Sequence, residues 1–217
     1  MAANYPALQS LSKKVTRTPM GIFGMPVTHL LYLHGFRSSP QSTKARQVAA
    51  RVRECHPQVT WWCPQLPPSP KAAMQQVMQG IAQWPAEMAV IGSSLGGFYA
   101  ACVAQARDCK AVLLNPAVNP ARDLGQHIGE QTSWHKPDEH FFFEPRFVDE
   151  LRALESGPPV PPENVFAIIA KGDEVLDWRE MMGRYPGAAT KLLEGGDHAL
   201  SDFGAHIDDV FAFLELA

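Results

Sequence analysis

Short apolar runs alternate with helix-like segments along the chain from residue 28 onward. Six runs have the length and composition of buried strands: HLLYLH (29–34), VTWWC (59–63), EMAVI (87–91), AVLLN (111–115), VFAIIA (165–170) and TKLLE (190–194). Apolar residues at helical spacing predict helices at 39–55, 70–84, 95–107 and 202–216. The first helix is expected to begin with Ser39 as its N-cap and Pro40 in its first turn.

This alternation predicts an α/β fold. Strand–helix–strand order favours a doubly wound, mostly parallel sheet of about six strands, with a ligand crevice at the carboxyl ends of the strands. With 217 residues and 46% hydrophobic composition, the chain suits one large domain, which we place at 28–217. Residues 1–27 contain three prolines and little periodicity, and are expected to form a loosely held extension. Segment 116–150 is a candidate cap or lid insertion.

Charge and cysteine content narrow the functional classes. Lys+Arg 19 against Asp+Glu 22 leaves a net charge of −3 with no basic block, so a nucleic-acid partner is not expected. The four cysteines lack C-x-x-C spacing and are expected to be reduced thiols. No apolar run is long enough for a membrane helix, which favours a cytoplasmic protein. The sequence does not predict an oligomeric state. His135, Asp138 and His140 lack metal-site spacing, so neither a metal nor a cofactor is expected.

The segment VIGSSLGG (90–97) carries the first candidate chemistry. Gly92-Ser93-Ser94-Leu95-Gly96 matches G-x-S-x-G only when Ser94 is the central residue. In such a nucleophile elbow, a strand turns sharply into a helix, and the residues two before and two after the serine must be small. The predicted flanking strand and helix fit this context. The alternative is a Gly/Ser turn that serves only close helix packing.

An acid and a histidine follow in the order that a serine hydrolase needs. KGDEVLDW offers Asp173 and Asp177 after one strand, and GGDHAL places His198 after the next. Taken singly, each has a simpler explanation, as a helix cap or a solvated loop residue. Their order after successive strands favours a triad of Ser94, Asp173 and His198. Asp173 lies just past the strand, whereas Asp177 precedes a helix-like segment that it would cap.

The loop after the first strand, LHGFRSS (33–39), is a candidate oxyanion loop. Attack on an ester carbonyl creates a negative charge that needs backbone N–H donors, for which Phe36 and Leu95 are expected. His34 is expected to be structural. Arg37 would contact an anionic substrate group or pair with a nearby carboxylate. The aromatic residues of HFFFEPRF and Trp134 would either line a lid over an acyl chain or fill the core.

Five motifs together resemble the YqiA/YcfP-like esterase family of small α/β-hydrolases: LYLHGFRSSPQSTKA, IGSSLGGFYA, LLNPAVNP, GDEVLDW and EGGDHAL. The resemblance runs from about residue 29 to the C-terminus and leaves out 1–27 and most of 127–143. It implies a compact α/β-hydrolase core and hydrolysis of acyl esters or thioesters through Ser94, Asp173 and His198, without a cofactor. Two other functions stay open: a peptidase or lactone hydrolase with the same triad, and a silent binding protein on a hydrolase scaffold.

Overall fold

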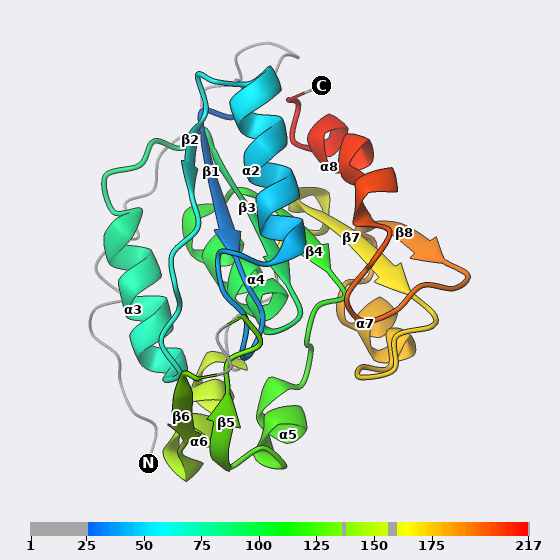
Figure 1. Cartoon of the computed structure of the whole chain (residues 1–217). Helices are drawn as coiled ribbons and strands as arrows, with labels where there is room; N and C mark the ends of the chain where they lie inside the picture. The colour runs from blue at the N-terminus through cyan, green and yellow to red at the C-terminus, as the bar shows by residue number, and fades with distance from the viewer. Residues whose placement is uncertain (1–25, 136–137, 156–159, 217) are drawn as a thin grey trace.

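The central element of the computed structural model, which describes residues 26–135, 138–155 and 160–216, is a six-stranded parallel sheet (Figure 1). Its strands lie in the order β2-β1-β3-β4-β7-β8. Their bounds are β1 (His29–Leu33), β2 (Thr60–Trp62), β3 (Met88–Ser93), β4 (Lys110–Leu114), β7 (Val165–Ala170) and β8 (Ala189–Leu193). All five pairings are parallel. The predicted α/β fold and its six strands are therefore confirmed.

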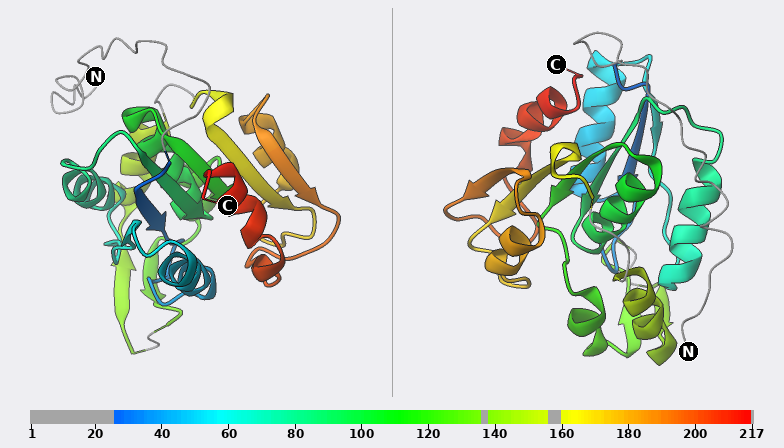
Figure 2. Two further views of the ribbon diagram at one scale, coloured as in Figure 1. Left: turned by 90° about the horizontal axis from the view of Figure 1, so that it is seen from above. Right: turned by 180° about the vertical axis from the view of Figure 1, so that it is seen from behind.

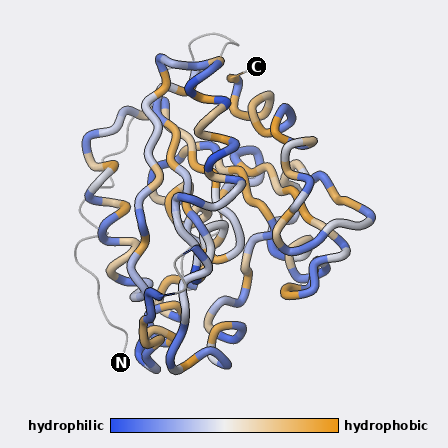
Figure 3. Tube along the Cα trace, viewed as in Figure 1, coloured by the Kyte–Doolittle hydropathy of each residue, from blue (hydrophilic) through white to orange (hydrophobic). Residues whose placement is uncertain are grey.

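Helices cover both faces of the sheet (Figure 2). On one face, α2 (Thr43–Cys55) and α8 (Ile207–Phe213) pack on alternate strand residues such as Leu30. On the other face, the main helices are α3 (Pro70–Gly80) and α4 (Leu95–Arg107), which pack on the intervening residues such as Leu31. Because each inner strand is buried on both faces, its sequence is continuously apolar. In Figure 3 the central strands are coloured as hydrophobic, while hydrophobic and hydrophilic residues alternate along the outer helix α3.

The chain between β4 and β7 forms a separate layer beyond the carboxyl ends of β1 and β3 (Figure 1). Its elements are α5 (Pro120–Gly125), β5 (Gly129–Thr132), β6 (His140–Phe143) and α6 (Pro145–Glu155), with β5 and β6 paired as an antiparallel hairpin. Phe143 and Phe147 are buried in the core, whereas Phe142 and Trp134 are 59% and 65% exposed. The aromatic residues thus divide between core and surface. A lid role for this layer remains a proposal.

Some predicted helix bounds are wrong. Helix α2 begins at Thr43, and Ser39 instead accepts a hydrogen bond from the Gln41 amide at 3.1 Å, so Ser39 stabilises a preceding turn. Helix α3 ends at Gly80, before the predicted residue 84. The predicted helix over 202–216 is a 3-10 turn, η2 (Phe203–Ala205), followed by α8, because His206 between them departs from helical φ at −116°. None of the described helices is long and apolar enough to cross a bilayer.

The strand order fixes where a ligand would bind. The chain runs from β1 to the edge at β2, then returns to β3 on the other side of β1 and continues outward. In an open parallel sheet, the loops on the two sides of this reversal part and leave a crevice at the carboxyl ends of the strands. Here that crevice lies between the loop after β1 and the loop after β3. The sequence places the candidate oxyanion loop and Ser94 in these two loops.

Candidate active site

Ser94 occupies a sharp turn between β3 and α4. Its backbone has φ 56° and ψ −123°, a conformation that is strained for a residue with a side chain. The flanking glycines permit the turn: a Cβ atom on Gly92 would lie 2.1 Å from the Gly96 carbonyl oxygen, and one on Gly96 would lie 2.0 Å from the Leu33 carbonyl oxygen. This strand–turn–helix geometry is that of a nucleophile elbow.

A chain of hydrogen bonds joins Ser94 to a histidine and a carboxylate. His198 Nε2 lies 3.0 Å from Ser94 Oγ, and His198 Nδ1 lies 2.8 Å from Asp173 Oδ2. The carboxylate only accepts, so Nδ1 carries the proton and Nε2 is free to accept from the serine hydroxyl. The structure thus brings together three residues that the sequence predicts, each from the carboxyl end of a different strand.

The loop after β7 fixes the carboxylate. Asp173 Oδ1 accepts hydrogen bonds from the Val175 and Leu176 amides, both at 2.8 Å, which leaves Oδ2 for the histidine. The Asp173 side chain is fully buried, whereas that of His198 is 21% exposed. Asp177 has the other predicted role: it is the N-cap of α7 (Trp178–Arg184), and its side chain accepts from the Arg179 amide at 2.9 Å.

The loop after β1 lies against the serine. A Cβ atom on Gly35 would be 3.2 Å from Ser94 Cβ and 3.6 Å from Ser94 Oγ, so a side chain at this position would crowd the serine. Phe36 is next in this loop, and Leu95 is the first residue of α4. Within the described part of the chain, neither of their amides has a hydrogen-bond acceptor. Both amides are therefore available to a ligand beside Ser94.

His34 connects this loop to the segment after β2. Its Nε2 accepts from the Leu66 amide at 3.0 Å, so its Nδ1 carries the proton and donates to the Gly35 carbonyl at 3.0 Å. Burial lowers the pKa of His34 to about 4, which keeps the imidazole neutral at pH 7. A protonated ring would direct a second N–H at the Leu66 amide. These contacts give His34 a structural role, as the sequence reasoning expected.

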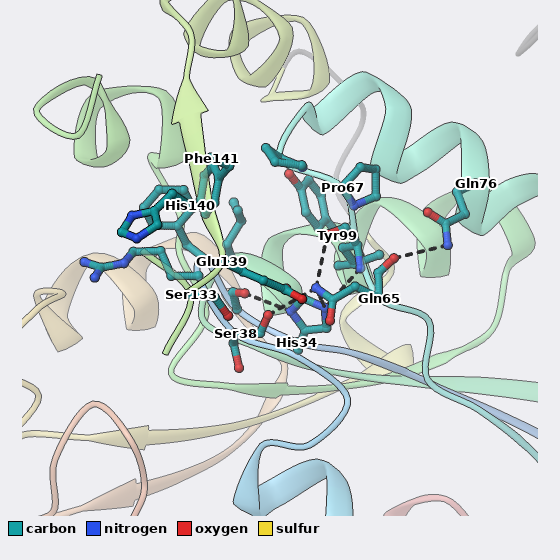
Figure 4. Close-up of a pocket in the computed structure, with 16 residues that line it drawn as sticks. His34, Ser38, Gln65, Pro67, Gln76, Tyr99, Ser133, Glu139, His140 and Phe141 are labelled. Atoms are coloured by element: carbon teal, nitrogen blue, oxygen red, sulfur yellow. Dashed lines mark hydrogen bonds between the residues drawn. The ribbon is translucent and has the colours of Figure 1, made fainter. Parts of the chain in front are cut away.

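A cavity of about 400 Å³ opens beside the candidate oxyanion loop (Figure 4). Apolar and aromatic side chains form much of its wall, including Phe36, Leu66, Leu95 and Phe141. The hairpin contributes to this wall because the Phe36 ring packs edge-on against Phe141, with ring centroids 5.8 Å apart. The cavity therefore reaches from Phe36 and Leu95, the two candidate oxyanion residues, to the layer formed by the β5–β6 hairpin.

Arg37 joins the oxyanion loop to the hairpin. Its Nε donates to the Thr132 carbonyl at 2.7 Å, and its guanidinium lies 4.2 Å from the centre of the Trp134 ring. The Trp134 amide in turn donates to the Arg37 carbonyl at 2.8 Å. Across the described residues no carboxylate pairs with Arg37, so the ion pair that was one of the two sequence interpretations is not seen there. The observed contacts fix the cavity wall in place.

The loop after β8 that begins at Gly195 and carries His198, here the histidine loop, is held by side chains that the sequence does not predict, among them Lys44 and Glu174. The Lys44 ammonium on α2 donates to the Ala199 carbonyl, and its burial lowers the pKa of Lys44 to about 8. Glu174, which follows the candidate acid, accepts from the His198 amide at 3.0 Å. Both contacts join segments that are distant in the sequence, and a lysine on a helix or a glutamate in a loop gives no sequence signal for them. Among the described residues, no group of three or more metal-ligating side chains occurs.

Residues 29–215 match the uncharacterised protein family UPF0227. The chain belongs to this family. The match agrees with the resemblance to the YqiA/YcfP-like esterases that the sequence motifs carry, and it spans every described strand and helix.

Solved structures show that this UPF0227 member has the α/β-hydrolase fold. Mouse α/β-hydrolase domain-containing protein 10 is 17% identical with a TM-score of 0.63, covering 88% of this chain and 92% of that chain. A structure from work on LipS and LipT, two metagenome-derived lipolytic enzymes, is 15% identical with a TM-score of 0.64, covering 88% and 95%. Est1E from Butyrivibrio proteoclasticus, with ferulic acid bound, is 14% identical with a TM-score of 0.63, covering 88% of both chains. At these identities the likeness establishes the fold.

Proposed function

We propose that this protein is a serine esterase that hydrolyses acyl esters or thioesters. The observation that carries the proposal is the continuous hydrogen-bond chain from Ser94 Oγ through His198 to Asp173, with distances of 3.0 and 2.8 Å. A serine hydroxyl alone is a weak nucleophile, and it becomes reactive when a neutral imidazole accepts its proton and a carboxylate orients that imidazole. In this proposal Ser94 is the nucleophile, His198 the general base and Asp173 the orienting acid.

Acylation uses the groups around the elbow. As Ser94 Oγ bonds to the carbonyl carbon, its proton moves to His198 Nε2, and the carbonyl oxygen becomes an oxyanion. In this proposal the Phe36 and Leu95 amides donate hydrogen bonds to this oxygen. Removal of one such donor costs about 100-fold or more in kcat in enzymes of this kind. The tetrahedral intermediate collapses when His198 gives its proton to the leaving alkoxide or thiolate, which departs as the alcohol or thiol.

Deacylation repeats the same steps with water. His198 takes a proton from a water molecule, whose oxygen attacks the acyl carbon and forms a second oxyanion. Collapse returns the proton to Ser94 Oγ and releases the carboxylic acid. The balance is one ester and one water converted to one acid and one alcohol or thiol. The 21% exposed His198 side chain gives water access to the base, while the buried Asp173 stays out of solvent.

Two further observations support ester chemistry. The partly apolar cavity adjoins the oxyanion amides and offers room for the remainder of an ester substrate. The comparison structures include one from work on lipolytic enzymes and one of Est1E with ferulic acid bound, both on the same fold.

The test is a hydrolysis panel with one acyl group on three leaving groups: a p-nitrophenyl ester, an alkyl thioester and an anilide, with a lactone added. We expect turnover of the ester or thioester, and a fall of several orders of magnitude in Ser94→Ala. Ser93→Ala is the matched control, since Ser93 is buried and belongs to β3. Turnover of the anilide or lactone alone would favour a peptidase or lactone hydrolase, and no turnover of any compound would favour a silent binding protein.

A further inference from the structure

We infer that Asn115 is a positioning residue that sets the place of His198 relative to Ser94 and Asp173, an inference that rests on the proposed function. Asn115 directly follows β4, the strand between the one that leads to Ser94 and the one that leads to Asp173. It is completely buried, at 0% exposure. A buried polar side chain is costly unless its hydrogen bonds are made, so its partners show what it stabilises.

The Asn115 side chain joins two of the candidate catalytic loops. Its Nδ2 donates to the carbonyl oxygens of Asp197 and His198, at 3.0 and 3.2 Å. Its Oδ1 accepts from the amide of Ala170, the last residue of β7, at 2.8 Å. Both N–H groups thus donate to carbonyls of the histidine loop, and the oxygen accepts from the strand that leads to Asp173.

The backbone around Asn115 reaches the third loop. The Ser94 amide donates to the carbonyl of Leu114, the residue before Asn115, at 3.0 Å, and the Ala117 amide donates to the Ser94 carbonyl at 3.0 Å. Asn115 has φ 41°, in the left-handed region that asparagine tolerates better than most residues. One short turn after β4 therefore contacts the nucleophile, the acid strand and the histidine loop.

Only an amide side chain supplies this set of contacts. Two donors on one nitrogen and one acceptor on the adjacent oxygen match two carbonyls and one N–H. An aspartate in the same place would direct an oxygen at two carbonyl oxygens, which repel it. A smaller side chain would leave these groups without partners, and they would regain hydrogen bonds only by moving.

Such a movement affects the base more than the fold. The histidine loop begins with Gly195 and Gly196, and it keeps its other contacts to Lys44 and Glu174 when Asn115 is changed. It would therefore shift rather than unfold. A displacement on the order of 1 Å in a reacting group costs about 100-fold in rate. The predicted effect is accordingly on kcat, with little change in substrate binding.

The experiment compares Asn115→Gly and Asn115→Asp with wild type. Glycine tolerates the positive φ and removes the whole side chain, and aspartate keeps the shape and replaces the donor nitrogen with an acceptor oxygen. We expect kcat on a p-nitrophenyl ester to fall about 100-fold in both variants, with KM within about threefold of wild type. The low-field proton NMR resonance of the His198 Nδ1–H that faces Asp173 should weaken or disappear.

Two controls separate positioning from general destabilisation. Asn119→Ala removes an exposed asparagine four positions along, whose Nδ2 contacts Glu180, and should keep wild-type kcat. Val112→Ala creates a cavity in the buried part of β4 and should lower the melting temperature while it keeps kcat and the low-field resonance. A kcat within about threefold of wild type in folded Asn115→Gly and Asn115→Asp would overturn the inference, as would an equal loss of kcat in Val112→Ala. Failure of the proposed function would give a different result: wild type itself would show no turnover that depends on Ser94.

Discussion

Two aspartates four residues apart in one loop have different roles because their oxygens meet different groups. Asp173 uses one oxygen for the Val175 and Leu176 amides and the other for His198, and its side chain is fully buried. Asp177 is half-exposed; one of its oxygens accepts from the Arg179 amide at the start of α7 and also lies 3.5 Å from the Arg179 guanidinium. The first arrangement fixes the direction of a carboxylate, and the second stabilises a helix terminus.

The substitution Asp173→Asn should lower kcat by about 1,000-fold or more, as loss of a triad acid does. The two backbone amides would hold the carbonyl oxygen of the new side chain, so its NH₂ group would face His198 Nδ1. The imidazole would then carry its proton on Nε2 and could not accept from Ser94.

Asp177→Asn, in contrast, keeps a good N-cap and should retain near-normal turnover, at a cost of at most about 1 kcal/mol in stability. Steady-state kinetics on one ester compares the two variants; normal turnover in Asp173→Asn with collapse in Asp177→Asn would reverse the assignment.

At the residue scale, the sequence predicts the role of a side chain where its neighbours in the chain form a recognisable motif. Ser94 stands between two glycines at fixed spacing, and Asp173 and His198 each follow an apolar run that reads as a strand. Asn115 also follows a predicted strand, but nothing near Asn115 or Lys44 in the chain points to their roles, since the residues of the histidine loop that they contact lie 82 and more positions away. A single polar residue after a strand carries no functional signal by itself, because ordinary turns contain such residues too. Only the folded chain shows that both side chains hold the histidine loop.

At the scale of elements, strands were easier to predict than helix ends. A strand buried on both faces is apolar throughout, and β7 accordingly matches its predicted range. Among the helices, the one after the elbow also matches its predicted range, 95–107. Helix ends depend on local competition for backbone groups: Ser39 could have capped α2, but it stabilises an earlier turn. The layer from α5 to α6 shows no strand pattern in the sequence because β5 and β6 are short and half-exposed.

The loops after β1 and β2 depend on His34, and this gives the fold a pH dependence. The pKa of His34 is lowered to about 4 from its ordinary value of 6.5, mainly by burial. Between these values the unfolded chain takes up a proton that the folded chain does not, so the contribution of His34 is fully present above pH 6.5 and is lost as the pH falls toward 4. The shift corresponds to about 3 kcal/mol in the free energy of unfolding.

Urea unfolding of wild type and His34→Gln at about pH 7.5 and about pH 4.5 measures this contribution. Other groups also titrate in this range, so the quantity of interest is the difference between the two proteins. Wild type should lose about 2 to 3 kcal/mol more than His34→Gln over the interval. Equal losses in both proteins would show that His34 is not held neutral in the folded state.

At the scale of the whole molecule, the regular order of strands and helices predicts a parallel sheet, but it does not give the strand order. The order β2-β1-β3-β4-β7-β8 arises from packing between distant segments. It has the functional consequence that the loops after β1 and β3 part at the chain reversal, while those after β7 and β8 carry Asp173 and His198 to the same edge (Figure 1). Every group in the proposed mechanism comes from that edge.

The most direct test of the central claim is intact-protein mass spectrometry after treatment with a fluorophosphonate, which reacts with activated serines. The account predicts a single adduct on wild type, mapped to Ser94 by peptide analysis. It also predicts no adduct on Ser94→Ala and normal labelling of Ser93→Ala. An adduct on Ser93, or one that persists in Ser94→Ala, would contradict the account.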